Sequence, residues 1–353
     1  MTPVALPGFR SLSTHHCVTG SMRHLYAFHG QATSEEMLLG LGNGVGFIYW
    51  QAAGAPPMLG GRANVGRPGE EGLERLAGRR TGVTVTSRET ASAGRAEAAL
   101  LEALAGGEPL MVQVDMGELG YLDLPPGFDF GAHVVVVAGA DPAARRALVA
   151  DRDAPLHEVA LDELERARGS RCRPWPPQHR WWTFDFSAAR PPSADEVLAA
   201  IAETSAAMLR PPIANLGVRG IRTAAQRLRG WPAALGPDQL PGACLNAFTM
   251  IDASGGTGGG CFRSMYSTFL REAAEMTAEP VLAAAGDAMG EVAASWQEVA
   301  EALRQAPAAP DPAASLGHAA DLLVSIADRE QAVWSRLAEV AGAGSVAVAR
   351  RVR

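Results

Sequence analysis

The pattern of the sequence changes near residue 185, and this change limits the folds that the chain can adopt. Before it, apolar runs of strand length, such as PLMVQVD (109–115) and HVVVVAG (133–139), follow short amphipathic segments. After it, the sequence is rich in alanine and keeps helical periodicity almost to its end. Helices followed by a run of strands are typical of an α+β fold. We therefore expect an α+β domain over residues 1–185 and a mainly α-helical domain over residues 186–353.

Local signals indicate where individual elements begin. Thr33 and Glu36 form a T-x-x-E capping box before a short helix, and Ser193 and Glu196 form another before ADEVLAAIAETSAAML. In the first half we expect helices over residues 21–28, 92–105 and 160–168, and strands over residues 83–87, 109–115, 133–139 and 147–151.

Composition excludes several classes of function. The chain has 353 residues and a net charge of −7, which argues against nucleic-acid binding, and it contains no lysine, which excludes Schiff-base catalysis and a P-loop. The longest apolar run is too short to cross a bilayer, and the N-terminus lacks the pattern of a secretory signal. The four cysteines are scattered and form no CxxC pair, so no structural zinc site is expected. These features are typical of a cytoplasmic protein with free thiols, no membrane contact and no metal.

Cys17 directly precedes the first expected helix. A helix start favours the thiolate form of cysteine, which is the nucleophilic form. Such a thiolate needs a histidine and an acid that orients it. His133 opens an apolar strand, and Asp151 ends the next strand, so a hairpin would bring them to one end of the sheet. Cysteine first, followed by a histidine and an acid at neighbouring strand ends, is the papain-type arrangement. Asp153 is a rival for the role of the acid. The alternative is that Cys17 is a small packing residue.

A second glycine-rich segment, SGGTGGGCFR, lies in the helical half. Its backbone N–H groups at Gly258 and Gly259, with Arg263, could hold a phosphate or carboxylate at a helix start. The alternative is a tight turn that lets helices pack closely. No lysine follows the glycines, so this is not a nucleotide P-loop. The remaining cysteines, including Cys261 beside these glycines, are interpreted as structural.

The segment HHCVTGSMRHLYAFHGQATSEEMLLGLGNGVGFIYW resembles the N-terminal signature of the butirosin-biosynthesis-H-type acyltransferase family. GAHVVVVAGAD and LVADRDAPLHEVALDELERAR are similar to the His and Asp segments of that family and of the double-glycine-leader cysteine peptidases. GTGGGCFRSMYSTFLREAAE resembles the helical domain that accompanies it. The resemblance implies a papain-like acyltransferase with Cys17 as nucleophile, His133 as general base and acid, and Asp151 as the orienting acid.

The resemblance also implies the partners. The enzyme would take an acyl group from the phosphopantetheine thioester of an acyl carrier protein and give it to a small-molecule amine, with no cofactor of its own. The related peptidases use a glutamine before the cysteine for the oxyanion hole. SLSTHH has none, so His16 or Asn43 is expected to assist the Cys17 N–H.

Several alternatives remain. Water could be the acceptor, which would make the chain a cysteine peptidase or thioesterase, or the domain could be a non-catalytic binding module. ARGSRCR (167–173) could be a carrier-docking arginine patch or a solvated face. The helical domain is compatible with a homodimer.

Overall fold

The computed structural model describes residues 3–51, 56–66 and 70–351, and they form two compact units. The first unit contains Met1–Leu38 and Gly66–Pro191; the second contains Leu39–Val65 and Pro192–Arg353. The boundary that we expected between residues 185 and 186 stays a prediction. The units add a feature that we did not predict, because residues 39–65 group with the helical half of the chain.

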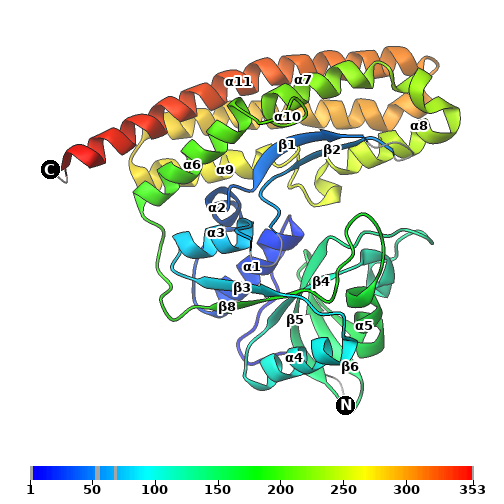
Figure 1. Ribbon diagram of the computed structural model, residues 1–353, viewed down its shortest axis with the longest axis vertical. Helices are drawn as coiled ribbons and strands as arrows, with labels where there is room; N and C mark the ends of the chain where they lie inside the picture. Colours follow the sequence, from blue (N-terminus) through cyan, green and yellow to red (C-terminus); the bar gives the residue numbers. More distant parts are fainter. Residues whose placement is uncertain (1–2, 52–55, 67–69, 352–353) are drawn as a thin grey trace. The chain divides into compact units, whose positions relative to one another are not determined.

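A six-stranded antiparallel sheet is the centre of the first unit (Figure 1). Its strand order is β3-β8-β4-β5-β6-β7. The strands are β3 (Thr84–Arg88), β4 (Leu110–Val114), β5 (His133–Asp141), β6 (Arg146–Ala150), β7 (Leu156–Ala160) and β8 (Trp181–Asp185). The four expected strands are present, and β5 and β6 pair as the predicted hairpin. Because strands β5 to β7 are consecutive neighbours, their connections are short and their ends lie close together.

Two helices cover one face of this sheet. Val135 and Val137 of β5 point to the same face because side chains alternate along a strand. They pack in one buried cluster with Leu100 of α4 (Ala93–Ala105) and with Leu161 and Leu164 of α5 (Leu161–Gly169). The amphipathic patterns of both helices thus meet the apolar side of the strands.

The remaining helices of the first unit are α1 (Cys17–Phe28) and α3 (Leu73–Arg80), together with the start of α2 (Glu35–Leu41). Two 3-10 turns, η1 (Met116–Glu118) and η2 (Gly120–Leu122), follow β4. Helix α1 begins at Cys17 itself, so the cysteine lies in the helix and not before it as expected. The expected capping box at Thr33 is wrong: α2 begins one residue later, and the Ser34 hydroxyl accepts the Met37 N–H at 2.9 Å.

The second unit combines a two-stranded hairpin with long helices (Figure 1). Its elements are β1 (Val45–Trp50), β2 (Met58–Arg62), α6 (Ala194–Leu209), α7 (Gly217–Leu228), α8 (Trp231–Thr249), α9 (Arg263–Thr277), α10 (Pro280–Gln305) and α11 (Pro312–Arg351). Helix α11 packs along α6, α7 and α10. The predicted capping box of Ser193 and Glu196 is present at the start of α6.

The fold class expected from the sequence is confirmed at the level of an α+β chain with antiparallel sheets and a helical C-terminal part. None of the helices in the described part of the chain has the length and apolar character that a membrane-spanning segment needs.

Candidate active site

Cys17 is the first residue of α1, and its side chain is half-buried. The preceding residue, His16, has extended backbone (φ −111°, ψ 133°) and acts as the helix cap. At this first position the backbone N–H of Cys17 has no partner within the helix. The thiol therefore lies where the helix dipole favours a negative charge.

A buried carboxylate fixes the start of this helix. Glu35, the first residue of α2, is fully buried. Its Oε1 accepts the His16 N–H at 2.7 Å and the Thr19 hydroxyl at 2.9 Å, and its Oε2 accepts the His15 N–H at 2.9 Å. Hydrogen bonds to a charged acceptor are stronger than neutral ones. Glu35 thus holds the two residues before Cys17 and the first turn after it, a role that no sequence motif indicated.

The structure brings Cys17, His133 and Asp151 together within the first unit. His133 starts β5 and Asp151 directly follows β6, so the hairpin places them diagonally across two paired strands. The His133 Nε2 donates to Asp151 Oδ2 at 2.8 Å, and both side chains are only 3% exposed. The thiol of Cys17 lies near enough to His133 for this histidine to lower its pKa. Because Nε2 faces Asp151, Nδ1 is the nitrogen left for the thiol.

Asp151 has two further partners. The Tyr121 hydroxyl donates to the same Oδ2 at 2.8 Å, and the Arg152 N–H donates to Oδ1 at 2.8 Å. Tyr121 comes from η2 and stacks on the His157 ring, with centroids 4.1 Å apart. No sequence pattern indicated Tyr121, because a single tyrosine in an irregular turn has no distinctive spacing.

The rival acid, Asp153, lies in a different environment. Its Oδ1 accepts from His157 Nε2 at 2.7 Å, and its side chain is 54% exposed. Of the two aspartates, Asp151 is the one bonded to His133.

The charges of this cluster shift its pKa values in opposite directions. Burial raises the pKa of Cys17, but the charges of His16 and His133 and their hydrogen bonds lower it well below 9.0. Burial lowers the pKa of His133, while the charge and hydrogen bond of Asp151 and the contact with Cys17 raise it to about 10. Burial raises the pKa of Asp151, but the charge and hydrogen bond of His133 outweigh burial and lower it to about 2. At neutral pH this arrangement favours a thiolate beside an imidazolium.

The other cysteines differ from Cys17 in this respect. Burial raises the pKa of Cys244 to about 11 and that of Cys261 to about 12. Burial also raises the pKa of Cys172, although Ser170 opposes it. Among the four cysteines, all of which are described, only Cys17 therefore has a thiol that favours ionisation. In the described part of the chain no cluster of His, Cys, Asp and Glu could hold a metal ion.

The residues expected to bind substrate lie in different places. His16 is buried beside Cys17, with its Nδ1 3.1 Å from Thr19 Oγ1. Asn43 belongs to the second unit, where its Nδ2 donates to Glu203 at 2.6 Å. Their expected part in an oxyanion hole stays a prediction.

The glycine-rich segment is also in the second unit and is tightly packed. Gly258 and Gly259 have left-handed backbone (φ 66° and 92°), and a Cβ on the adjacent Gly260 would lie 2.7 Å from Ala293. Arg263 is fully buried, and its Nε and Nη2 donate to Glu330 at 2.8 and 2.9 Å. The geometry matches the tight-turn alternative and gives no support to substrate binding by Arg263.

Family models account for most of the chain. Residues 16–152, which contain the Cys17, His133 and Asp151 cluster, match the family described as butirosin biosynthesis protein H, N-terminal. This segment belongs to that family. The family expected from the sequence is thereby confirmed. Residues 162–337 match a domain of unknown function (DUF4872), and no curated protein matches the chain.

Proposed function

We propose that this chain is a cysteine-dependent acyltransferase of antibiotic biosynthesis with a papain-like N-terminal domain. The family to which residues 16–152 belong is named for a protein of butirosin biosynthesis, which supports a biosynthetic role. The observation that carries the proposal is the buried hydrogen bond of His133 to Asp151, with Cys17 near His133 at the start of α1. A thiol at a helix start, beside a histidine held by a buried acid, is suited to nucleophilic attack on an acyl group.

The first half-reaction forms an acyl-enzyme. The Cys17 thiolate attacks the carbonyl carbon of an acyl-pantetheine thioester, and a new C–S bond forms. The bond to the pantetheine sulfur then breaks, and the imidazolium of His133 gives its proton to the departing thiolate. The Cys17 N–H at the start of α1 is a candidate donor to the oxyanion that develops on the carbonyl oxygen.

The second half-reaction transfers the acyl group. An amine attacks the acyl-Cys17 carbonyl, neutral His133 takes the amine proton, and the Cys17 thiolate leaves. The amide product is more stable than the thioester, so this step drives the reaction forward. The phosphopantetheine belongs to the donor, carried by an acyl carrier protein, and the enzyme needs no cofactor for these steps.

Intact-protein mass spectrometry tests the acyl-enzyme. The protein is mixed with an acyl-pantetheine thioester and quenched rapidly, as wild type, as C17A and as C172A. C172A is the matched control because Cys172 is also a free, half-buried cysteine. We expect the mass of one acyl group on wild type and C172A and none on C17A. An adduct on C17A, or none on wild type, would contradict the proposed nucleophile.

The acceptor is tested separately, by product analysis with and without a small-molecule amine. Amide formation that depends on Cys17 supports transfer. If the acyl group is released as the free acid at the same rate in both samples, water is the acceptor and the chain is a hydrolase. If the protein is not acylated and does not hydrolyse the thioester, and C17A binds the carrier protein as tightly as wild type does, the chain is a binding module.

A further inference from the structure

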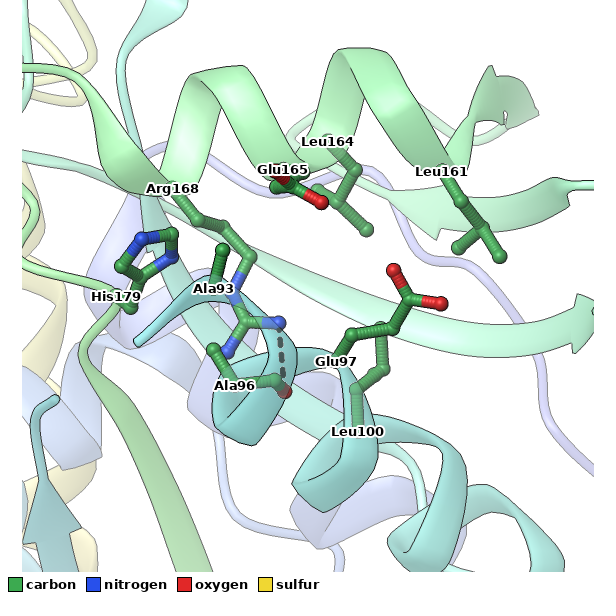
Figure 2. Close-up of a pocket in the computed structure, with 9 residues that line it drawn as sticks. All are labelled: Ala93, Ala96, Glu97, Leu100, Leu161, Leu164, Glu165, Arg168 and His179. Carbon is green, nitrogen blue, oxygen red and sulfur yellow. Dashed lines mark hydrogen bonds between the residues drawn. The ribbon is translucent and has the colours of Figure 1, made fainter. Parts of the chain in front are cut away.

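A pocket lies in the first unit between α4 and α5, and its lining contains none of Cys17, His133 and Asp151. Its space is narrow, with room for about one water-sized group, and part of it is open to solvent. Figure 2 shows the Arg168 side chain passing from α5 to the first turns of α4, with the His179 ring on one side and Glu97 on the other. This arginine comes from ARGSRCR (167–173), for which we expected exposed arginines, yet it is only 2% exposed.

The guanidinium of Arg168 is only partly paired. Its Nη1 donates to the Ala96 carbonyl at 3.1 Å, whereas Nε and Nη2 are buried and have no hydrogen-bond partner in the described part of the chain. Leaving buried donors unpaired costs free energy, and such groups in native proteins generally have a partner, which can be a water or an ion. The unpaired atoms of Arg168 therefore indicate a partner other than the described residues.

The position of the unpaired atoms indicates what that partner is. Nε and Nη2 form one edge of a guanidinium, and this edge matches the two oxygens of a carboxylate or phosphate. The same chain provides the comparison, because Arg263 uses its Nε and Nη2 to bind both oxygens of Glu330. Arg168 presents the same edge without a carboxylate.

Two further features make the pocket favourable for an anion. Ala93, the first residue of α4, lines it, and the first turn of this 13-residue helix contains no acidic residue. Backbone N–H groups at a helix start attract negative charge. His179 is only 8% exposed, and its Nδ1 is also buried without a partner among the described residues. The backbone of His179 is left-handed (φ 49°), and its N–H donates to the Arg168 carbonyl at 2.8 Å.

The acidic residues that line the pocket do not take this place. The Glu97 carboxylate is paired with Arg145, and Glu165 is exposed to solvent. Burial lowers the pKa of Arg168 to about 10, although the charge of Glu97 opposes this. Burial and the charge of Arg168 lower the pKa of His179, while Glu165 opposes them. Both shifts have the sign expected for cations whose burial outweighs the nearby negative charge.

We propose that this pocket binds a small oxyanion, a carboxylate or phosphate group, on the Nε and Nη2 of Arg168, with His179 and the start of α4 as further contacts. The site is separate from the proposed acyl transfer and does not depend on it. The bound group would belong to a free metabolite or to a larger molecule that inserts its charged end.

The test uses the full chain labelled with ¹⁵N, titrated with inorganic phosphate and, separately, with acetate at ionic strength held constant by sodium chloride. We expect a saturable shift of the Arg168 Nε–H resonance and a rise in the pKa of His179, because a bound anion stabilises the charged ring. A larger shift with phosphate than with acetate would indicate a phosphorylated ligand. A larger shift with acetate would indicate a ligand with a carboxylate. The melting temperature should rise with the logarithm of the anion concentration.

Two variants assign the effect. R168Q should abolish the thermal shift, whereas R166Q, which removes an exposed arginine two residues earlier on the same helix, should keep it. If R168Q does not fold, E97Q decides, because removing a lining negative charge should tighten anion binding by about threefold. The proposal is overturned if neither anion moves the Arg168 resonance, if sodium chloride moves it as much, or if R168Q keeps the thermal shift. In these cases water alone completes the guanidinium.

Discussion

The charge of Asp151 should control the ionisation of Cys17 through His133, and Asp151→Asn tests this link. The substitution keeps the shape of the side chain and removes its charge 2.8 Å from the His133 Nε2. Burial lowers the pKa of His133, but the charge and hydrogen bond of Asp151 outweigh burial. The pKa of His133 therefore rises from 6.5 to about 10. That difference corresponds to roughly 5 kcal/mol. A charge pair 4 Å apart at an effective dielectric constant of 20 contributes about 4 kcal/mol, so one carboxylate accounts for most of the rise.

The expected result is a change in how alkylation of Cys17 depends on pH. In wild type the pKa of Cys17 lies well below 9.0, so the rate of alkylation by iodoacetamide should begin to fall only well below pH 9. In D151N, His133 loses its charge near neutral pH and no longer stabilises the thiolate. The pKa of Cys17 should therefore rise, and each unit by which it exceeds the assay pH lowers the alkylation rate about tenfold. Acyl transfer should fall further, by about 10⁴-fold, since the imidazole also loses its orientation.

The assay is intact-protein mass spectrometry of alkylated protein over a series of times and pH values. D153N is the matched control, because it removes the same charge two residues later from a carboxylate bonded to His157 instead. It should keep the wild-type profile. If D151N alkylates at pH 6 as fast as wild type, the reasoning fails, and the helix start with His16 must stabilise the thiolate without the His133–Asp151 pair.

Two other predictions concern stability, measured by urea unfolding. Glu35→Gln should destabilise the protein by about 2–3 kcal/mol, because one of the two oxygens that accept N–H groups becomes a donor. E36Q, at the next and more exposed position, should cost little, and an equal loss in both would contradict the role given to Glu35. Glu330→Gln should cost about 3–5 kcal/mol by leaving the Arg263 charge buried and unpaired. The double variant R263M/E330Q should recover part of that loss, and no recovery would refute the coupling of the pair.

The part of the site that local patterns describe could be predicted from the sequence. A cysteine before an amphipathic segment, a histidine opening an apolar run and an aspartate ending the next run are each visible within a few residues. Antiparallel pairing of neighbouring strands then brings the histidine and the aspartate together, because a hairpin connects adjacent strand ends. The family segment, residues 16–152, was recognisable for the same reason.

Contacts between distant segments could not be predicted. Glu35, Tyr121 and the burial of Arg168 depend on how irregular turns and helix faces meet, and none of them leaves a periodic signal. Arg263 shows the same limit. Its glycine-rich setting indicated an anion site, but the anion is Glu330, 67 residues later in the chain. A charged residue in a suggestive motif can be satisfied by a partner that the motif does not contain.

The grouping of residues 39–65 with the helical half has a consequence for dividing the gene. The β1–β2 hairpin contributes the Gly46 carbonyl to Arg263, and Phe47 packs against Trp296 of α10. A chain cut after residue 185 would keep the hairpin and lose both partners, leaving apolar surface exposed to solvent. Recombination between related genes at that point would therefore transfer a catalytic segment with part of another unit's interior attached. The two halves are expected to be inherited and exchanged together, although separate family models describe them.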